Sequence, residues 1–227
     1  MSYWTNRQER LKKAAEKNEE KLRKRLESFY AAEFRRLDRE IAGYYKDYGE
    51  NEVLQYRALL QTLSDADRAL LIERMDDFEK KYPQYADLMP IRKSIYQLDR
   101  LQGLQYSVLM TEAEIAGYTD DQMTEYLTKL SQQGLNYAME TLGFGKNFYS
   151  ISSDIVRQFV GVPWSNGENF STRIWNDTQK LARYLNQDIA QGFARGDSYA
   201  RLVQNLQKRF IRVNRRDVYR LIYTEGT

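Results

Sequence analysis

The chain of 227 residues contains no cysteine and no histidine. Without cysteine it forms neither a disulfide nor a thiolate site, which is compatible with a reducing cytosol. Without histidine it lacks the commonest general base and the commonest transition-metal ligand. A serine or cysteine triad is therefore excluded in its usual form, and we expect no zinc site and no cofactor. No paired carboxylates stand at a recognisable catalytic spacing either, so the sequence predicts a protein that is not an enzyme.

Turn-forming residues and long apolar runs are also scarce. The sequence has three prolines and twelve glycines, too few for an all-β fold, in which each tight turn usually contains one of them. No apolar run approaches the ~20 residues that cross a bilayer, and the charged N-terminus has no apolar core segment. We therefore expect no membrane contact and no signal peptide. The content of 42% hydrophobic and 30% charged residues favours helices with much solvated surface.

Helical periodicity is clearest at the N-terminus. Apolar residues recur three or four positions apart from Leu22 to Tyr48, which predicts one long helix over residues 5–48. Residues 5–20 carry almost no apolar stripe and many charges. This segment is either a solvated helix with ion pairs between residues four positions apart or an arm that docks on a partner. We expect it to project from the body of the protein.

Shorter helices follow, separated by recognisable breaks. We expect one over 52–63, one capped by Ser64 and stopped by Pro83, one from Pro90 to a break at Gly117, and one capped by Thr119 that runs to Gly143. The connections are short, so consecutive helices should pack antiparallel. The predicted fold is mainly α, an elongated multi-helix bundle with a long N-terminal helix.

Residues 143–170 differ in character because glycine and aromatic residues alternate there without a clear period. We expect a small irregular linker with a short helix over 153–160. The predicted organisation is an N-terminal helical bundle over 1–142 with a projecting first helix, the linker over 143–170, and a C-terminal helical segment over 171–227.

The C-terminal segment opens with a loop bracketed by two tryptophans. We assign structural roles to Trp164, Gly167, Phe170 and Trp175, which should pin the loop against the bundle. Ser171 is expected to cap the helix that follows, whose apolar face runs through positions 174, 178, 181, 185 and 189. Gly196 should end that helix, and Asp197 or Ser198 should cap the next one.

Several of these motifs carry a family resemblance. They are Trp164-x-x-Gly167-x-x-Phe170-Ser-x-Arg173-Ile174, then Gly192-x-x-x-Gly196-x-Ser198, then Leu221-Ile222-x-Thr224-Glu225, and at the N-terminus Tyr3-Trp4-x-x-Arg7. Together they resemble the minor head proteins of tailed bacteriophages, the Mu F-like head morphogenesis family. In that family the Thr-Glu pair usually precedes a further domain, so we expect the natural chain to continue past Thr227. We assign Tyr3, Trp4 and Arg7 to a protein interface.

The resemblance implies a function in head assembly. Such a protein would be present in few copies at the portal vertex, bind the portal and other capsid components, and act in head morphogenesis, DNA packaging or DNA delivery. Its location would be the virion, and the bacterial host cytoplasm during assembly. Eighteen tyrosines suit either self-association through aromatic faces or half-buried positions that cover the bundle.

A basic run near the C-terminus is the other candidate site. It comprises Lys208, Arg209, Arg212, Arg215, Arg216 and Arg220, with Asp217 as the one acid between positions 201 and 220. These cations suit nucleic-acid phosphates, an acidic protein surface or plain solvation. The alternative function is therefore a stand-alone nucleic-acid-binding helical protein that uses this run.

Overall fold

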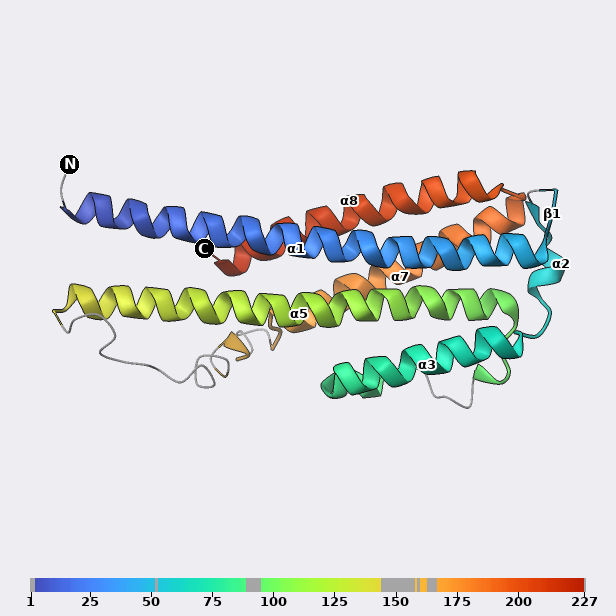
Figure 1. The fold of residues 1–227 in the computed structure, drawn as a ribbon, viewed down its shortest axis with the longest axis horizontal. Helices are drawn as coiled ribbons and strands as arrows, with labels where there is room; N and C mark the ends of the chain where they lie inside the picture. The colour runs from blue at the N-terminus through green and yellow to red at the C-terminus, as the bar shows by residue number, and fades with distance from the viewer. Residues whose placement is uncertain are drawn as a thin grey trace. The chain divides into compact units, whose positions relative to one another are not determined.

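The computed structural model describes residues 3–51, 53–88, 95–143, 158, 160–162 and 167–226. Within them the helices are α1 (Tyr3–Tyr48), α2 (Tyr56–Leu59), α3 (Asp65–Lys81), α5 (Arg100–Thr141), α7 (Phe170–Arg195) and α8 (Tyr199–Gly226), with a 3-10 helix, η1, at Pro83–Leu88. Two short strands, β1 (Gly49–Glu50) and β2 (Val53–Leu54), form an antiparallel pair (Figure 1). The prediction of a mainly α, multi-helix fold with a long N-terminal helix is confirmed. No helix among these residues is long and apolar enough to span a membrane.

The segment after α1 differs from the prediction. A helix was expected over 52–63, but the chain forms the β1–β2 hairpin first and only a four-residue α2 afterwards. Asn51 has a φ of 51°, in the left-handed region that asparagine tolerates better than most residues. That backbone conformation suits a tight hairpin turn and not a helix. The turn at Asn51 therefore determines the local structure, although the spacing of apolar residues after it is typical of a helix.

Helix α3 begins and ends where the sequence predicts. The Ser64 hydroxyl accepts a hydrogen bond from the Asp67 amide at 3.1 Å and donates one to the Asp67 carboxylate at 2.6 Å. The helix stops at Lys81, immediately before Tyr82 and Pro83. Its buried residues are Leu71, Met75 and Phe78.

Helix α5 corrects the prediction of a break at Gly117. It runs without interruption from Arg100 to Thr141, so Thr119 lies inside the helix and caps nothing. A Cβ added at Gly117 would lie 2.8 Å from the ring of Tyr82. The glycine is present because a buried tyrosine packs against the helix backbone at this point. The predicted start at Pro90 lies outside the described residues; Asp99 and Gln102 cap α5 through reciprocal backbone to side-chain bonds of 2.7 and 3.0 Å.

The turn between α7 and α8 is built as the sequence indicates. Gly196 has a φ of 69° and ends α7, with its amide bonded to the Phe193 carbonyl at 3.0 Å. The Asp197 amide bonds to the Gly192 carbonyl at 2.9 Å, which completes a Schellman motif. The N-terminal cap of α7 is a correction: the Asn169 side chain, and not Ser171, accepts from the Thr172 amide at 2.9 Å.

The chain forms two compact units, each assembled from segments that are distant in sequence. Unit 1 comprises residues 1–28, 118–174 and 216–227, and unit 2 comprises residues 29–117 and 175–215. The predicted linker over 143–170, including its helix over 153–160, falls mostly outside the described residues, so that boundary stays a prediction.

Aromatic packing holds the core of unit 2. The Trp175 ring is buried, 4.4 Å from the ring of Tyr85 and 6.3 Å from that of Phe78. Phe34 of α1 meets Phe210 of α8 with ring centroids 5.1 Å apart. These contacts join α7 to α3 and η1, and α1 to α8.

A partly buried ion network also lies in unit 2. The Arg74 guanidinium of α3 bonds to Glu40 of α1 at 2.9 Å, and to Thr111 at 3.2 Å and Glu114 at 3.4 Å, both on α5. Arg36 of α1 also pairs with Glu114. Burial lowers the pKa of Arg74 to about 10, although Glu40 opposes the shift. Each charged group has an opposite charge beside it, so the network links three helices without an isolated charge in a partly buried position.

In unit 1 the beginning of α1 is attached to α5. The Arg7 guanidinium pairs with Glu140 at 2.5 Å and lies over the ring of Tyr137 at 4.5 Å from its centroid. Arg25 bonds to the Gln122 side chain at 3.3 Å. At Arg7, an ion pair and a ring contact therefore attach α1 to α5 where an apolar stripe is missing. The expected projection of residues 5–20 from the body stays a prediction.

Candidate functional site

The six predicted cations of α8 separate into two sets. Lys208, Arg212 and Arg215 are exposed, and within the described part of the chain they have neither an ion pair nor a hydrogen bond. They lie four and three positions apart, so they share one helical face across about 10 Å of helix. Their charges are available to a partner.

The other three cations have carboxylate partners within the chain. Arg209 forms a bidentate ion pair with Asp188 of α7: Nη2 donates to Oδ1 at 3.0 Å, and Nε donates to Oδ2. Arg216 bonds to Asp217 at 2.9 Å, and Arg220 lies 3.9 Å from the same carboxylate. These three belong to the sequence-predicted site, but the structure gives them an internal role.

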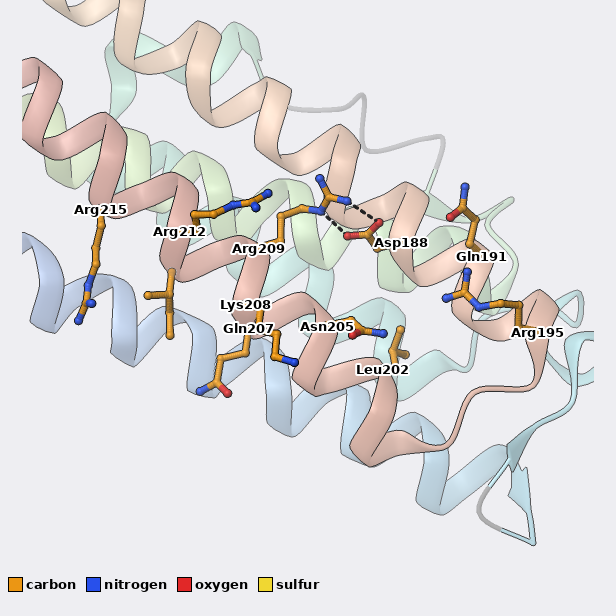
Figure 2. Close-up of a pocket in the computed structure, with 11 residues that line it drawn as sticks. Asp188, Gln191, Arg195, Leu202, Asn205, Gln207, Lys208, Arg209, Arg212 and Arg215 are labelled. Atoms are coloured by element: carbon orange, nitrogen blue, oxygen red, sulfur yellow. Dashed lines mark hydrogen bonds and ion pairs between the residues drawn. The ribbon is translucent and has the colours of Figure 1, made fainter.

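An open groove of about 890 Å³ runs between α7 and α8 within unit 2. Figure 2 shows Asp188, Gln191 and Arg195 on α7, and the Arg209 guanidinium reaching across to Asp188. The groove is lined by Asp188, Gln191, Arg195, Leu202, Asn205, Gln207, Lys208, Arg209, Ile211, Arg212 and Arg215. The three free cations therefore belong to a surface that also carries amides and apolar side chains.

Arg195 is held in this groove by the turn between the two helices. Its Nη2 and Nε lie 2.8 and 3.2 Å from Oδ2 of Asp197, whose side chain is only 2% exposed. The hydrogen bond from Arg195 lowers the pKa of Asp197, although desolvation opposes the shift. Arg201 lies 3.4 Å from the other carboxylate oxygen. The carboxylate stays ionised at neutral pH and compensates Arg195.

This arrangement of side chains is suited to binding anionic groups. The guanidinium groups of Arg195 and Arg209, which carboxylates hold, and the cations of α8 that are unpaired among the described residues suit carboxylates or phosphates, as ion pairs with charge-assisted hydrogen bonds. No group of three or more carboxylates that would hold a metal ion occurs among the residues with a described position.

The remaining predicted residues are not all described. The side chains of Tyr3 and Trp4 and the whole of Trp164 lie outside the described residues, so their assigned roles stay predictions. Gly167 has a φ of 79°. Phe170 is buried, as Trp175 is, and both lie in the first turns of α7.

Sequence reasoning missed the α7 side of the groove. Asp188, Gln191 and Arg195 lie three or four positions apart on α7, opposite the basic run once Gly196 turns the chain. The spacing and the bend were both visible in the sequence. The pairing of Arg209 with Asp188 was not, because it depends on how the two helices are rotated against each other.

Comparisons of this chain with family models, with curated proteins and with solved structures give no match.

Proposed function

We propose that this chain is a helical assembly protein of a tailed-phage head, of the minor head type that its motifs resemble. In this function it binds the portal and other capsid components in the virion or in the host cytoplasm during assembly. It uses surfaces for this purpose and no catalytic centre.

One contact carries the proposal. Arg173, from the Phe-Ser-x-Arg-Ile motif, donates a hydrogen bond to the Thr224 hydroxyl of the Leu-Ile-x-Thr-Glu motif at 3.3 Å. The two residues are 51 positions apart. Motifs that were matched independently along the sequence thus meet in one place, as parts of a shared scaffold would.

The apolar residues of the same two motifs support this interpretation. Phe170, Ile174, Leu221 and Ile222 are all buried in unit 1, with relative exposures of 3–5%. Such positions specify packing, and they place no reactive group in a cleft. A resemblance built on packing residues supports a common architecture and, through it, membership in a class of structural proteins.

The test is co-expression with the portal protein encoded in the same genome. We expect the two chains to co-elute in gel filtration as a complex that persists at physiological salt. If the wild-type chain elutes alone beside an intact portal, the proposed function is refuted. A charge-neutral core variant such as Ile174→Ala serves as a check that loss of the complex follows loss of the fold.

The three free cations support a second candidate, a stand-alone nucleic-acid-binding protein. Phosphate contacts would retain the wild-type chain on duplex DNA at ~50 mM salt, independent of sequence. Retention on DNA together with no portal complex would favour this candidate over the first.

A further inference from the structure

The groove between α7 and α8 has features that narrow the kind of partner it binds. We infer that it is a docking site for an acidic helical segment of a partner protein. The inference rests on the proposed assembly function and specifies the partner chemistry at the α8 surface.

Charge is the first argument. Five cations line the groove, and Asp188 and Asp197 compensate Arg209 and Arg195. Lys208, Arg212 and Arg215 keep their full charge and no internal partner among the described residues. The unmatched charge is positive, so the complementary surface is acidic.

Spacing is the second argument. The three free cations occupy positions i, i+4 and i+7 of α8. Carboxylates at i, i+4 and i+7 of a second helix have the same rise, ~1.5 Å per residue, and lie on one face. A helix laid along the groove can therefore place three carboxylates opposite the three cations at once.

The apolar and amide lining is the third argument, and it distinguishes protein from nucleic acid. Ile211 lies between the cations in the sequence of α8 and is 41% exposed. Gln191 and Asn205 add amide groups from α7 and α8. A duplex backbone offers phosphates but no apolar counterpart to isoleucine, whereas a protein helix offers both carboxylates and aliphatic side chains.

The test uses a fluorescein-labelled, alanine-rich helical peptide with three glutamates at i, i+4 and i+7 and one leucine on the same face. Its isomer has the same composition, with the glutamates moved off that face. Fluorescence anisotropy at ~50 mM salt measures the dissociation constants, and a random-sequence duplex DNA is measured in parallel.

We expect the wild-type protein to bind the first peptide about tenfold more tightly than the isomer, a difference of about 1.4 kcal/mol. The variant Lys208→Gln/Arg212→Gln/Arg215→Gln should lose that preference. The control Arg35→Gln/Lys46→Gln/Arg57→Gln removes the same charge from exposed sites elsewhere in unit 2 and should bind within about twofold of wild type. Ile211→Ser should weaken binding of the peptide and leave any binding of DNA unchanged.

Three outcomes overturn the inference. They are equal affinity for the two peptides, an equal loss in the control variant, and tight DNA binding that the α8 variant abolishes while peptide binding is absent. The portal experiment separates this failure from failure of the proposed function. A portal complex that survives the α8 substitutions removes only the docking inference, and peptide binding without any portal complex removes only the assembly function.

Discussion

Replacement of Gly117 by alanine tests the contact that makes α5 continuous. Gly117 lies in the middle of α5, where a Cβ would come within 2.8 Å of two ring atoms of Tyr82 and 2.9 Å of a third. Tyr82 is 1% exposed, so its ring is enclosed by other parts of the protein and cannot swing out into solvent. The substitution therefore sets helix propensity directly against steric overlap.

The magnitudes favour the steric effect. Alanine in a helix interior is more favourable than glycine by about 0.8–1 kcal/mol. Overpacking of a well-packed core costs about 1–3 kcal/mol. Because a rigid buried ring and not a side-chain terminus is displaced, we take the upper half of that range. Gly117→Ala should then lower the free energy of unfolding by about 1–2 kcal/mol in net terms.

Gly43→Ala is the matched control. Gly43 lies inside α1 in the same compact unit, and an added Cβ there meets no atom within 4 Å. The control keeps the propensity gain without the overlap and should stabilise the protein by up to about 1 kcal/mol. The difference between the two variants isolates the cost of the Tyr82 contact.

Urea unfolding measures both changes. In a background with Trp4 and Trp164 replaced by phenylalanine, fluorescence reports on Trp175 alone, which lies in the same unit as Gly117. Linear extrapolation then gives the free energy of unfolding for that unit. If Gly117→Ala stabilises the protein as much as Gly43→Ala, the ring does not press on the helix and the reasoning is refuted. Adding Tyr82→Ala should remove the penalty of the Gly117 change, which a double-mutant cycle quantifies.

Two further predictions follow from the charged and phenolic groups of unit 2. Arg74→Ala should lower the free energy of unfolding by roughly 1–3 kcal/mol, because Glu40 loses its partner in a partly buried position while Glu114 keeps Arg36. Arg39→Ala at an exposed position should change it by less than about 0.5 kcal/mol, and equal effects in thermal melts would show that the network contributes nothing. The hydrogen bond to Asp38, aided by burial, raises the pKa of Tyr199 to about 12, so the folded state holds the phenolic proton more tightly and its contribution is present below pH ~10 and lost as pH rises to about 12. The stability difference between wild type and Tyr199→Phe should therefore shrink across that window, and a constant difference would contradict the assignment.

The sequence predicts the helices well where periodicity and capping agree. The stripe of α1, the Ser64 cap of α3 and the Gly196 bend between α7 and α8 all combine apolar spacing with a local signal at the helix end. Where one signal stood alone, the prediction failed. At Asn51 the chain forms a hairpin turn instead of the expected helix. Gly117 lies inside a helix and does not end it, because the ring of Tyr82 packs against the helix backbone where a Cβ would be.

The candidate site shows the same limit at the level of side chains. Helical periodicity places Lys208, Arg212 and Arg215 together on one face of α8, and this placement can be predicted from the sequence. It does not say that Arg209 is neutralised by Asp188, because that pair depends on the contact between α7 and α8. Three of the six predicted cations thus share two carboxylates of the chain, Asp188 and Asp217, and the surface left without such partners is smaller than the basic run indicates.

The motifs and the free cations therefore carry different parts of the proposed function. The motif residues Gly192 and Gly196 shape a helix end, and Phe170 and Leu221 fill the interior, so they determine an architecture. An architecture can serve many functions, and partner choice lies in exposed groups that the motifs do not include. Lys208, Arg212, Arg215 and Ile211 are such groups on α8. A family resemblance based on the buried positions accordingly supports the proposal of a structural assembly protein. Binding measurements on variants of these four residues identify the kind of partner that the protein binds.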